Sequence, residues 1–481
     1  MPELRPNTVN IETGLILGSS FVQGRGETFV VTDPCTEEEV VTMHAATAED
    51  IDEAVGIAAK AQKAYYSLGP EQWSSKLHKL ADLIDENMHE LASLDALCMG
   101  RPLSMAADIG LASKTIRLSA SSAVTHHGQS SQQMSDAFSF TLREPFGVCA
   151  AICPWNVPVV LCASKLGPAL ATGNAIIVKT SERSPLSLIL LGKLVLAAGI
   201  PAGTVQIVHG KGDVGAMLAS HPRIRRLAFT GSTAVGRKVL QMAAQSNLKR
   251  VTLELGGKGA ALVFDDADLK EAVEAIAFSI SWLSGQLCMC QSRIYVHESV
   301  AERFVEAFKA LYLNTPMGDS FDENSIMGPM VDPRARDSVT KVLENAEKEG
   351  GVISQGSIPS GKGFYVPATI IQGLSENSEV VKQEIFGPVV HINTFATEAE
   401  ALALANDTEY GLYCSVFTSD GSRAIRCAKG LSSGLISINQ SAPVFDLTLP
   451  FGGLRQSGLG REWGTEVLDE WTEVKSVAWK L

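Results

Sequence analysis

Cys288 closes the segment Gly285-Gln286-Leu287-Cys288, directly after a glycine that favours a tight turn. A thiolate is a strong nucleophile, so a cysteine presented on such a turn could attack an electrophilic carbon. Buried cysteines are nevertheless common and usually inert. None of the nine histidines lies in a motif that suggests a Cys-His hydrolase, and the pair Cys288 and Cys290 lacks the spacing of a zinc site. Cys288 is therefore a candidate nucleophile, and no metal is expected.

Glu254 stands between Leu253 and Leu255 and is followed by two glycines. Burial would raise the pKa of this carboxyl group and make it a usable general base. Alternatively, Glu254 is a structural carboxylate that accepts hydrogen bonds from the backbone amides of the glycine turn. The sequence leaves both interpretations open.

Two glycine-containing turns could approach a phosphate. Residues 210–215 match the pattern G-x-G-x-x-G, but the acidic residue expected about 20 positions further on is missing, so we interpret them as a tight turn near a cofactor. Residues 229–236 are the better candidate, because small hydroxyl residues lie at an expected helix N-terminus, where amides face an anion. Lys179 and Glu182 could bind ribose hydroxyls or could form an exposed ion pair.

The elements that would position these residues alternate between strand and helix. This alternation predicts an α/β fold with a parallel sheet, helices on both faces, and ligand sites at the carboxyl ends of the strands. Two further helices are expected upstream, one opened by a capping box at Thr47 and one from Pro70 to about Leu94. The expected strands span 175–178, 205–208, 227–229 and 260–264, and helices follow near Ser184, Val214 and Val235 and after a cap at Asp265 or Asp266.

Composition limits the class of protein. A chain of 481 residues with 45% hydrophobic and 19% charged residues is expected to form two or three globular domains. A net charge of −13 argues against nucleic acid or an anionic membrane as a partner. The N-terminus lacks a signal-peptide pattern, and the most apolar stretch, 146–164, is interrupted by prolines and cannot span a membrane. Together with nine scattered cysteines, these features predict a cytoplasmic protein with free thiols.

Six motifs in order along the chain resemble the signatures of the aldehyde dehydrogenase superfamily. The resemblance runs from about Glu49 to the C-terminus and includes the interval between Glu254 and Cys288. It continues in a C-terminal run of Asn439, 450–453, 457–458 and 460–462. The six motifs are Pro154-Trp155-Asn156-Val157-Pro158, the pair Lys179 and Glu182, the turn 231–236, the Glu254 turn, the Cys288 turn and Glu384-Ile385-Phe386-Gly387-Pro388.

The resemblance implies NAD-dependent oxidation of an aldehyde to its carboxylic acid. It makes Cys288 the nucleophile that forms a thiohemiacetal, whose oxyanion is held by the Asn156 side chain and the Cys288 N–H. Hydride transfer to the nicotinamide leaves a thioester, which Glu254 hydrolyses by activating water, and Lys165 matches a lysine near the proton path.

The same resemblance implies where the cofactor is held. The Glu182 carboxylate would repel a 2′-phosphate, so NAD is expected, with NADP as the alternative. The cofactor residues implied are Trp155, Lys179, Glu182, Gly215, Gly231, Ser232, Gly236, Leu255, Glu384 and Phe386.

A substrate tunnel is expected along the helix that follows Asn156. Val157, Val160, Leu161 and Ser164 fall on one helical stripe, and positions matching Val157 and Ser164 often carry large aromatics in this family. We therefore expect a roomy tunnel for a neutral, apolar aldehyde, although plain core packing would give the same stripe. The expected tunnel is completed by Trp282, Leu287, Val444, Phe445 and Phe451.

The sequence departs from the family pattern in three places. Leu283 stands where the family usually has asparagine, and Cys290 replaces a small residue and could form a sulfur link on oxidation. The segment 439–450 is about one residue longer than the family pattern.

By resemblance, residues 1–124 and 146–254 form an NAD-binding domain, 255–449 a catalytic domain, and 125–145 with 466–481 an oligomerisation arm. The arm implies a homodimer or homotetramer in which the tail strand 475–479 adds to a neighbour's sheet. Two alternatives remain open: the chain could be a CoA-acylating aldehyde dehydrogenase, or a catalytically silent scaffold member of the family.

Overall fold

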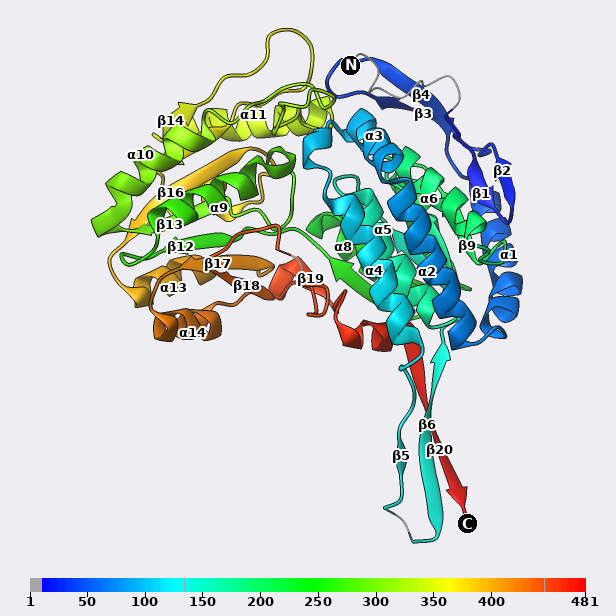
Figure 1. The fold of residues 1–481 in the computed structure, drawn as a ribbon. Helices are drawn as coiled ribbons and strands as arrows, with labels where there is room; N and C mark the ends of the chain where they lie inside the picture. Colours follow the sequence, from blue (N-terminus) through cyan, green and yellow to red (C-terminus); the bar gives the residue numbers. More distant parts are fainter. Residues whose placement is uncertain (1–10, 134, 445) are drawn as a thin grey trace.

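The computed structural model describes residues 11–133, 135–444 and 446–481, which form two large α/β sheets and a projecting arm (Figure 1). The first sheet has the order β19-β11-β10-β7-β8-β9-β1-β2. Its five central strands are parallel, β19 and β1 flank them in the antiparallel direction, and the edge strand β2 pairs antiparallel with β1. The strands are β1 (Leu15–Leu17), β2 (Ser20–Val22), β7 (Val148–Ile152), β8 (Ala175–Lys179), β9 (Val205–Val208), β10 (Arg226–Thr230), β11 (Arg250–Glu254) and β19 (Gly458–Leu459).

Helices cover both faces of this sheet. Alternate residues of its central strands accordingly belong to two different buried clusters, one on each face. One cluster packs against α1, α7 and α8, and the other packs against α2 to α6. A short hairpin, β3 (Thr28–Thr32) with β4 (Glu39–His44), precedes them. The helices are α1 (Ala48–Tyr66), α2 (Pro70–Glu86), α3 (Met88–Met99), α4 (Asp108–Ala123), α5 (Pro158–Ala171), α6 (Leu186–Ala197), α7 (Gly212–Ser220) and α8 (Thr233–Ser246).

The second sheet has the order β14-β15-β16-β13-β12-β17-β18, and all its strands are parallel except β14. Its strands are β12 (Ala260–Val263), β13 (Arg293–His297), β14 (Val352–Gln355), β15 (Thr369–Gln372), β16 (Val389–Phe395), β17 (Tyr413–Phe417) and β18 (Leu435–Ile438). Its helices are α9 (Leu269–Ser281), α10 (Ala301–Tyr312), α11 (Pro333–Lys348), α12 (Glu379–Lys382), α13 (Glu398–Asn406) and α14 (Gly421–Gly430).

The arm extends away from both large sheets (Figure 1). It consists of β5 (Ser130–Ser131), β6 (Ala137–Pro145) and β20 (Thr472–Lys480), and β6 pairs antiparallel with β20 along its whole length. The tail strand β20 therefore pairs with a strand of its own chain along one edge. Within the described ranges, no helix combines the length and apolarity that crossing a membrane requires.

The predicted α/β fold class is confirmed, and the expected strands appear as β8, β9, β10 and β12. The single helix predicted from Pro70 to about Leu94 is wrong, because the chain breaks at Asn87. The Asn87 side-chain amide donates to the Leu83 carbonyl at 2.7 Å, so it occupies an acceptor at the end of α2 and stops the helix. Met88 is consequently 37% exposed rather than part of the core stripe.

The predicted cap of α9 is also wrong. Asp268 caps this helix by accepting from the amides of Lys270 and Glu271, at 3.0 and 3.1 Å. Asp266 instead accepts from the Thr418 hydroxyl at 2.7 Å, on a loop distant in sequence. Two aspartates only two positions apart thus bind different partners, and the local sequence pattern alone does not distinguish them.

Candidate functional site

The Cys288 turn begins in left-handed backbone. Leu283, Ser284 and Gly285 have φ values of +55°, +52° and +73°. The Ser284 hydroxyl donates to the Gly328 carbonyl at 2.7 Å, and any side chain at Gly285 would lie 2.1 Å from the carbonyl oxygen of Gly387. Left-handed backbone favours asparagine and glycine over leucine, which gives a physical reason for the asparagine usual at the position of Leu283.

Asn156 lies in the loop between β7 and α5, beside this turn. Its buried side-chain amide donates to the Gln286 carbonyl at 3.0 Å, which leaves one N–H of the amide for another acceptor. The Gln286 side chain in turn accepts from the Val331 amide at 2.9 Å and fixes the turn from the other side. Asn156 is thereby held next to the backbone that leads into Cys288.

Glu254 ends β11 and is 3% exposed. Burial and the negative charge of Glu462 raise its pKa well above the usual value, against the opposing charges of Lys165 and Arg461. Its Oε2 has no hydrogen-bond partner within the described chain. The glycine turn that follows does not satisfy this carboxylate with the Gly257 amide, which donates to Glu384 instead, at 2.9 Å.

The same glycine turn brings β11 to the cysteine. A side chain at Gly257 would lie 2.2 Å from the carbonyl oxygen of Cys288, so only glycine permits this approach. Cys288 is partly exposed, and burial together with the charges of Glu384 and Glu254 raises the pKa of its thiol. The thiol therefore needs a base, or an approaching electrophile, before it reacts as a thiolate.

A buried polar cluster lies on α5 beside Glu254. Lys165 forms an ion pair of 2.7 Å with Glu462 and donates to the Leu161 carbonyl at 3.1 Å. Burial is the largest effect and would lower the pKa of Lys165, but the ion pair with Glu462 together with the charges of Cys153 and Glu254 outweighs it and raises this pKa. Sequence reasoning missed Glu462, although it lies inside the C-terminal run 460–462, because nothing local shows that it faces a lysine on α5.

The turn from β10 to α8 presents backbone amides to solvent. Ser232 caps α8 by accepting from the Val235 amide at 3.4 Å, and the first turn of the helix contains no acidic residue. Gly236 packs against Leu255 so closely that a side chain there would lie 2.5 Å from the leucine. This helix end suits a phosphate group.

Lys179 is the last residue of β8 and Glu182 lies in the loop that follows, with 3.9 Å between their charged atoms. Lys179 is 4% exposed, and burial lowers its pKa. Its ammonium donates to the Thr180 carbonyl at 2.9 Å, and its aliphatic stem passes Gly215 of α7, where a side chain would lie 3.8 Å from it. The pair is thus a half-buried one rather than the exposed ion pair considered from sequence.

Glu384 and Phe386 lie in the loop between α12 and β16 of the second sheet, and this loop contacts the glycine turn that follows β11 of the first sheet. A side chain at Gly256 would lie 2.2 Å from a carboxylate oxygen of Glu384, and burial raises the pKa of Glu384 to about 7 against the Gly257 amide and Lys258. Phe386 lies edge-on to Trp155 with 5.6 Å between the ring centroids. Two aromatic rings and a carboxylate therefore flank the space between the sheets.

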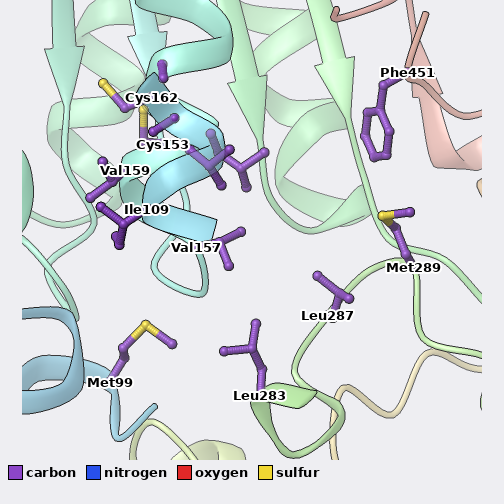
Figure 2. Packing of buried hydrophobic residues seen from close by; sticks show 14 of the residues in the cluster. Met99, Ile109, Cys153, Val157, Val159, Cys162, Leu283, Leu287, Met289 and Phe451 are labelled. Carbon is purple, nitrogen blue, oxygen red and sulfur yellow. The ribbon is translucent and has the colours of Figure 1, made fainter. Parts of the chain in front are cut away.

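Apolar side chains cluster near the cysteine turn. Val157, at the start of α5, faces Leu283 and Leu287 of the cysteine turn, and Phe451 lies beyond Met289 (Figure 2). Val157, Val160, Leu161, Trp282, Leu287 and Phe451 are buried, Val444 is half-buried, and Phe445 lies outside the described residues.

Trp282, Ser164 and Cys290, which lie near the predicted tunnel residues or the cysteine turn, form polar contacts. The Trp282 indole donates to the Met105 carbonyl at 3.0 Å. The Ser164 hydroxyl lies 2.7 Å from a carboxylate oxygen of Glu462. The Cys290 sulfur donates to the Ser279 carbonyl at 3.6 Å and so faces α9.

Comparisons with known proteins agree with this geometry. A family model described as the aldehyde dehydrogenase family matches residues 21–477. An aldehyde dehydrogenase of Alternaria alternata is 39% identical over 99% of this chain and 97% of its own length, and human retinaldehyde dehydrogenase 3 is 38% identical over 95% and 90%. The crystal structure of betaine aldehyde dehydrogenase from Staphylococcus aureus in complex with NAD+ superposes with a TM-score of 0.95 at 32% identity, covering 98% of this chain and 95% of that one.

Proposed function

The chain belongs to the aldehyde dehydrogenase family of NAD(P)-dependent oxidoreductases, and from this premise we propose that it oxidises neutral, apolar aldehydes to carboxylic acids with NAD. The observation that carries the proposal is the convergence of Cys288, Asn156 and Glu254 at the edge where the two sheets meet. Asn156 bonds to the cysteine turn, and the glycine turn after Glu254 packs against the Cys288 carbonyl.

Cys288 forms the bond to substrate in this mechanism. As its sulfur attacks the aldehyde carbon, the carbonyl oxygen becomes an oxyanion that the free N–H of Asn156 and the Cys288 amide stabilise. The thiol proton must leave, and Glu254 is the nearby base. Apolar walls around Val157 and Leu287 keep water from competing with these hydrogen bonds.

The residues on the cofactor side fit a dinucleotide. The exposed N-terminus of α8 with Ser232 suits the pyrophosphate, Lys179 and Glu182 suit the adenosine ribose, and Glu384 suits the nicotinamide ribose. Trp155 and Phe386 offer rings to the nicotinamide. When bound, NAD supplies the acceptor for the hydride that leaves the substrate carbon, so that a thioester remains on Cys288.

Hydrolysis of the thioester is the task of Glu254. A buried carboxylate with a raised pKa is a stronger base than an exposed one, and it takes a proton from the water that attacks the acyl carbon. The acid then leaves and the thiol is restored. Lys165 and Glu462 lie beside Glu254 and can pass the proton on.

The substrate class follows from the walls of the expected tunnel. Apart from Ser164, the predicted tunnel residues within the described ranges are aliphatic or aromatic, and none of them is cationic. Such walls favour a neutral, apolar aldehyde over a semialdehyde that carries a carboxylate.

The arm supports an oligomer as a further part of the proposal. One edge of β20 pairs with β6, and no strand among the described residues pairs with its other edge. β18 is an edge strand of the second sheet, and most of its residues are half-buried. We propose a homodimer or homotetramer in which β20 extends a neighbour's sheet. The division into an NAD-binding domain (1–124 and 146–254), a catalytic domain (255–449) and an arm (125–145 and 466–481), and a cytoplasmic location consistent with nine free thiols, belong to the same proposal.

The test is NADH formation by purified protein with acetaldehyde, hexanal and benzaldehyde, with and without CoA. We expect turnover without CoA, no turnover by Cys288→Ala, and retained turnover by Cys290→Ala, the matched control two residues away whose sulfur faces α9. Turnover only with CoA would replace water by CoA in the second half of the reaction. A protein that binds NAD but oxidises none of these aldehydes would overturn the proposal.

A further inference from the structure

Ser164 lies on α5 at a position where the family often carries a large aromatic side chain, and it is 1% exposed. Its hydroxyl is 2.7 Å from Glu462 Oε2 and 3.0 Å from the Leu161 carbonyl. A hydroxyl has one proton, so it can donate to only one of these acceptors at a time. The carboxylate is closer and charged, and it takes the stronger hydrogen bond.

The next residue of α5 holds the other oxygen of the same carboxylate. Lys165 Nζ lies 2.7 Å from Glu462 Oε1. Glu462 is therefore bound by two donors from one turn of a buried helix, one on each oxygen. With both oxygens engaged, the carboxylate cannot rotate without losing a bond, so its orientation is fixed.

Glu254 competes for the same lysine. Lys165 and Arg461 attract it and Glu462 repels it, and Cys288 faces it from the cysteine turn. Lys165 bonds to Glu462 and to the Leu161 carbonyl, whereas Glu254 Oε2 has no partner within the described chain. The Gly453 backbone amide already donates to the Glu254 carboxyl group, so Oε2 is the oxygen left over. The position of the Lys165 ammonium group thus decides whether this oxygen has a cationic partner.

Two further groups face Glu462 from other elements. Arg226 on β10 and Cys153 after β7 both interact with its charge. Neither donates a hydrogen bond to Glu462 that replaces that of Ser164. The Ser164 hydroxyl is therefore the contact that a single substitution can remove without adding or deleting a charge.

We propose that Ser164 is a positioning residue for the hydrolytic base: by holding Glu462 Oε2 it keeps Lys165 paired with Glu462 and away from Glu254. The inference rests on the proposed function, because it assigns Ser164 to the base of that reaction rather than to the tunnel wall alone. It predicts that Glu254 Oε2 remains without a cationic partner, and Glu254 hence strongly basic, only while Ser164 donates to Glu462.

The experiment compares Ser164→Ala with Ser164→Thr. Alanine removes the donor to Oε2, so the Glu462 carboxylate can rotate and Lys165, still bonded to Oε1, can move with it toward Glu254. The stronger attraction lowers the pKa of the base. We expect the pH midpoint of kcat for hexanal oxidation to move toward acid by about half a pH unit or more in Ser164→Ala. Ser164→Thr keeps the hydroxyl and should keep the wild-type midpoint, since a small cavity beside Ser164, lined also by Ser119 and Trp463, receives the added methyl group.

A second readout does not require turnover. Alkylation of Cys288 by iodoacetamide is measured against pH, because the charge of Glu254 acts on this thiol. The inflection that Glu254→Gln abolishes should move to lower pH in Ser164→Ala and stay in place in Ser164→Thr. This measurement separates failure of the inference from failure of the proposed function, which wild-type turnover tests by itself.

An unchanged pH midpoint in Ser164→Ala, in both measurements, would overturn the inference. If Ser164→Ala kept the wild-type pH midpoint but changed the ratio of kcat/KM for benzaldehyde to that for hexanal, Ser164 would act only as a residue of the substrate tunnel. A midpoint that moves equally in Ser164→Thr would overturn it too, because the hydroxyl would then be irrelevant. Thermal unfolding of each variant shows whether a change arises from lost stability.

Discussion

At the cofactor end of the site, Glu182 keeps 38% of its side chain exposed beside Lys179, whereas at the chemical end Glu254 is 3% exposed and Lys165 is fully buried. Each end therefore holds a lysine and a carboxylate from nearby elements. At the cofactor end the partners are three residues apart on one turn. At the chemical end Lys165 is paired with Glu462, almost 300 residues away in sequence.

The difference shows how burial changes what a charge does. Water screens the charge of Glu182, so removing this charge should alter the affinity for NADP, which carries a 2′-phosphate, by only a modest factor. Glu254 is shielded from water, and its raised pKa makes its protonation decide the rate of hydrolysis. We therefore expect large effects on kcat at the buried end and small effects on cofactor preference at the exposed end.

Glu254→Gln should have the largest effect in this comparison. The amide keeps the shape of the side chain but cannot accept a proton, and loss of a general base typically costs about 10²- to 10⁴-fold in rate. We expect kcat to fall by that order while Cys288 still acquires an acyl group. Rapid-mixing experiments should show one burst of NADH per active site followed by slow turnover. An unchanged steady-state rate would exclude Glu254 as the hydrolytic base.

The rate at the chemical end should also rise with pH. Only the ionised form of Glu254 accepts a proton, and its pKa is raised by burial and by Glu462, so activity should be low at acid pH and increase through the raised pKa. Glu254→Gln should lack this limb of the profile, which makes the profile and the variant a single test of the base.

Asn156→Ala should have the next largest effect. It removes an oxyanion donor and leaves the Gln286 carbonyl without the bond of 3.0 Å that it now accepts. Loss of one such donor costs about 10²- to 10³-fold in kcat. The binding of NAD, measured by fluorescence titration with NADH, should change little, since Asn156 is not among the residues proposed to hold the dinucleotide. Equal losses in NADH affinity and in kcat would instead indicate a collapsed loop.

Glu384 lies between the two ends and should show an intermediate effect. Its pKa is raised to about 7 by burial, and only the ionised form accepts hydrogen bonds from both ribose hydroxyls. The ionised fraction falls from half at pH 7 to about a tenth one pH unit below, so NAD affinity should fall roughly fivefold over that interval. Glu384→Gln should bind NAD more weakly and without this dependence, as titration at several pH values would show.

The sequence was more informative about the exposed end than about the buried one. Strands β8, β9 and β10 could be predicted because each is a short apolar run followed by a turn, and the turn residues Lys179, Glu182 and Ser232 are local to them. The break at Asn87 could not be predicted, because the spacing of apolar residues does not show that a side chain bonds to the end of its own helix. The pairing of Lys165 with Glu462 could not either, since it joins distant segments through the fold.

The roles of Cys288, Asn156 and Glu254 were inferred from the family resemblance, and they stay predictions until the variants are measured. What the structure adds is their proximity, through the Asn156 bond to the cysteine turn and the glycine turn after Glu254. It also gives a physical reason for the asparagine usual at the position of Leu283, which has left-handed backbone, whereas nothing in the structure explains the leucine.

Glu182→Gln should produce the smallest effect and is the sharpest test of the contrast between the two ends. Removing the charge lessens repulsion of a 2′-phosphate, so kcat/KM with NADP relative to NAD should rise by roughly three- to tenfold at low ionic strength and by less in high salt, since solvent screens an exposed carboxylate. The matched control is Glu274→Gln on α9, an exposed carboxylate beside Lys270 that lies outside the proposed cofactor site. An unchanged NADP ratio would remove Glu182 from cofactor selection. If Glu182→Gln also moved the pH profile of kcat, the exposed end would be coupled to Glu254, and burial alone would not explain why the two ends behave differently.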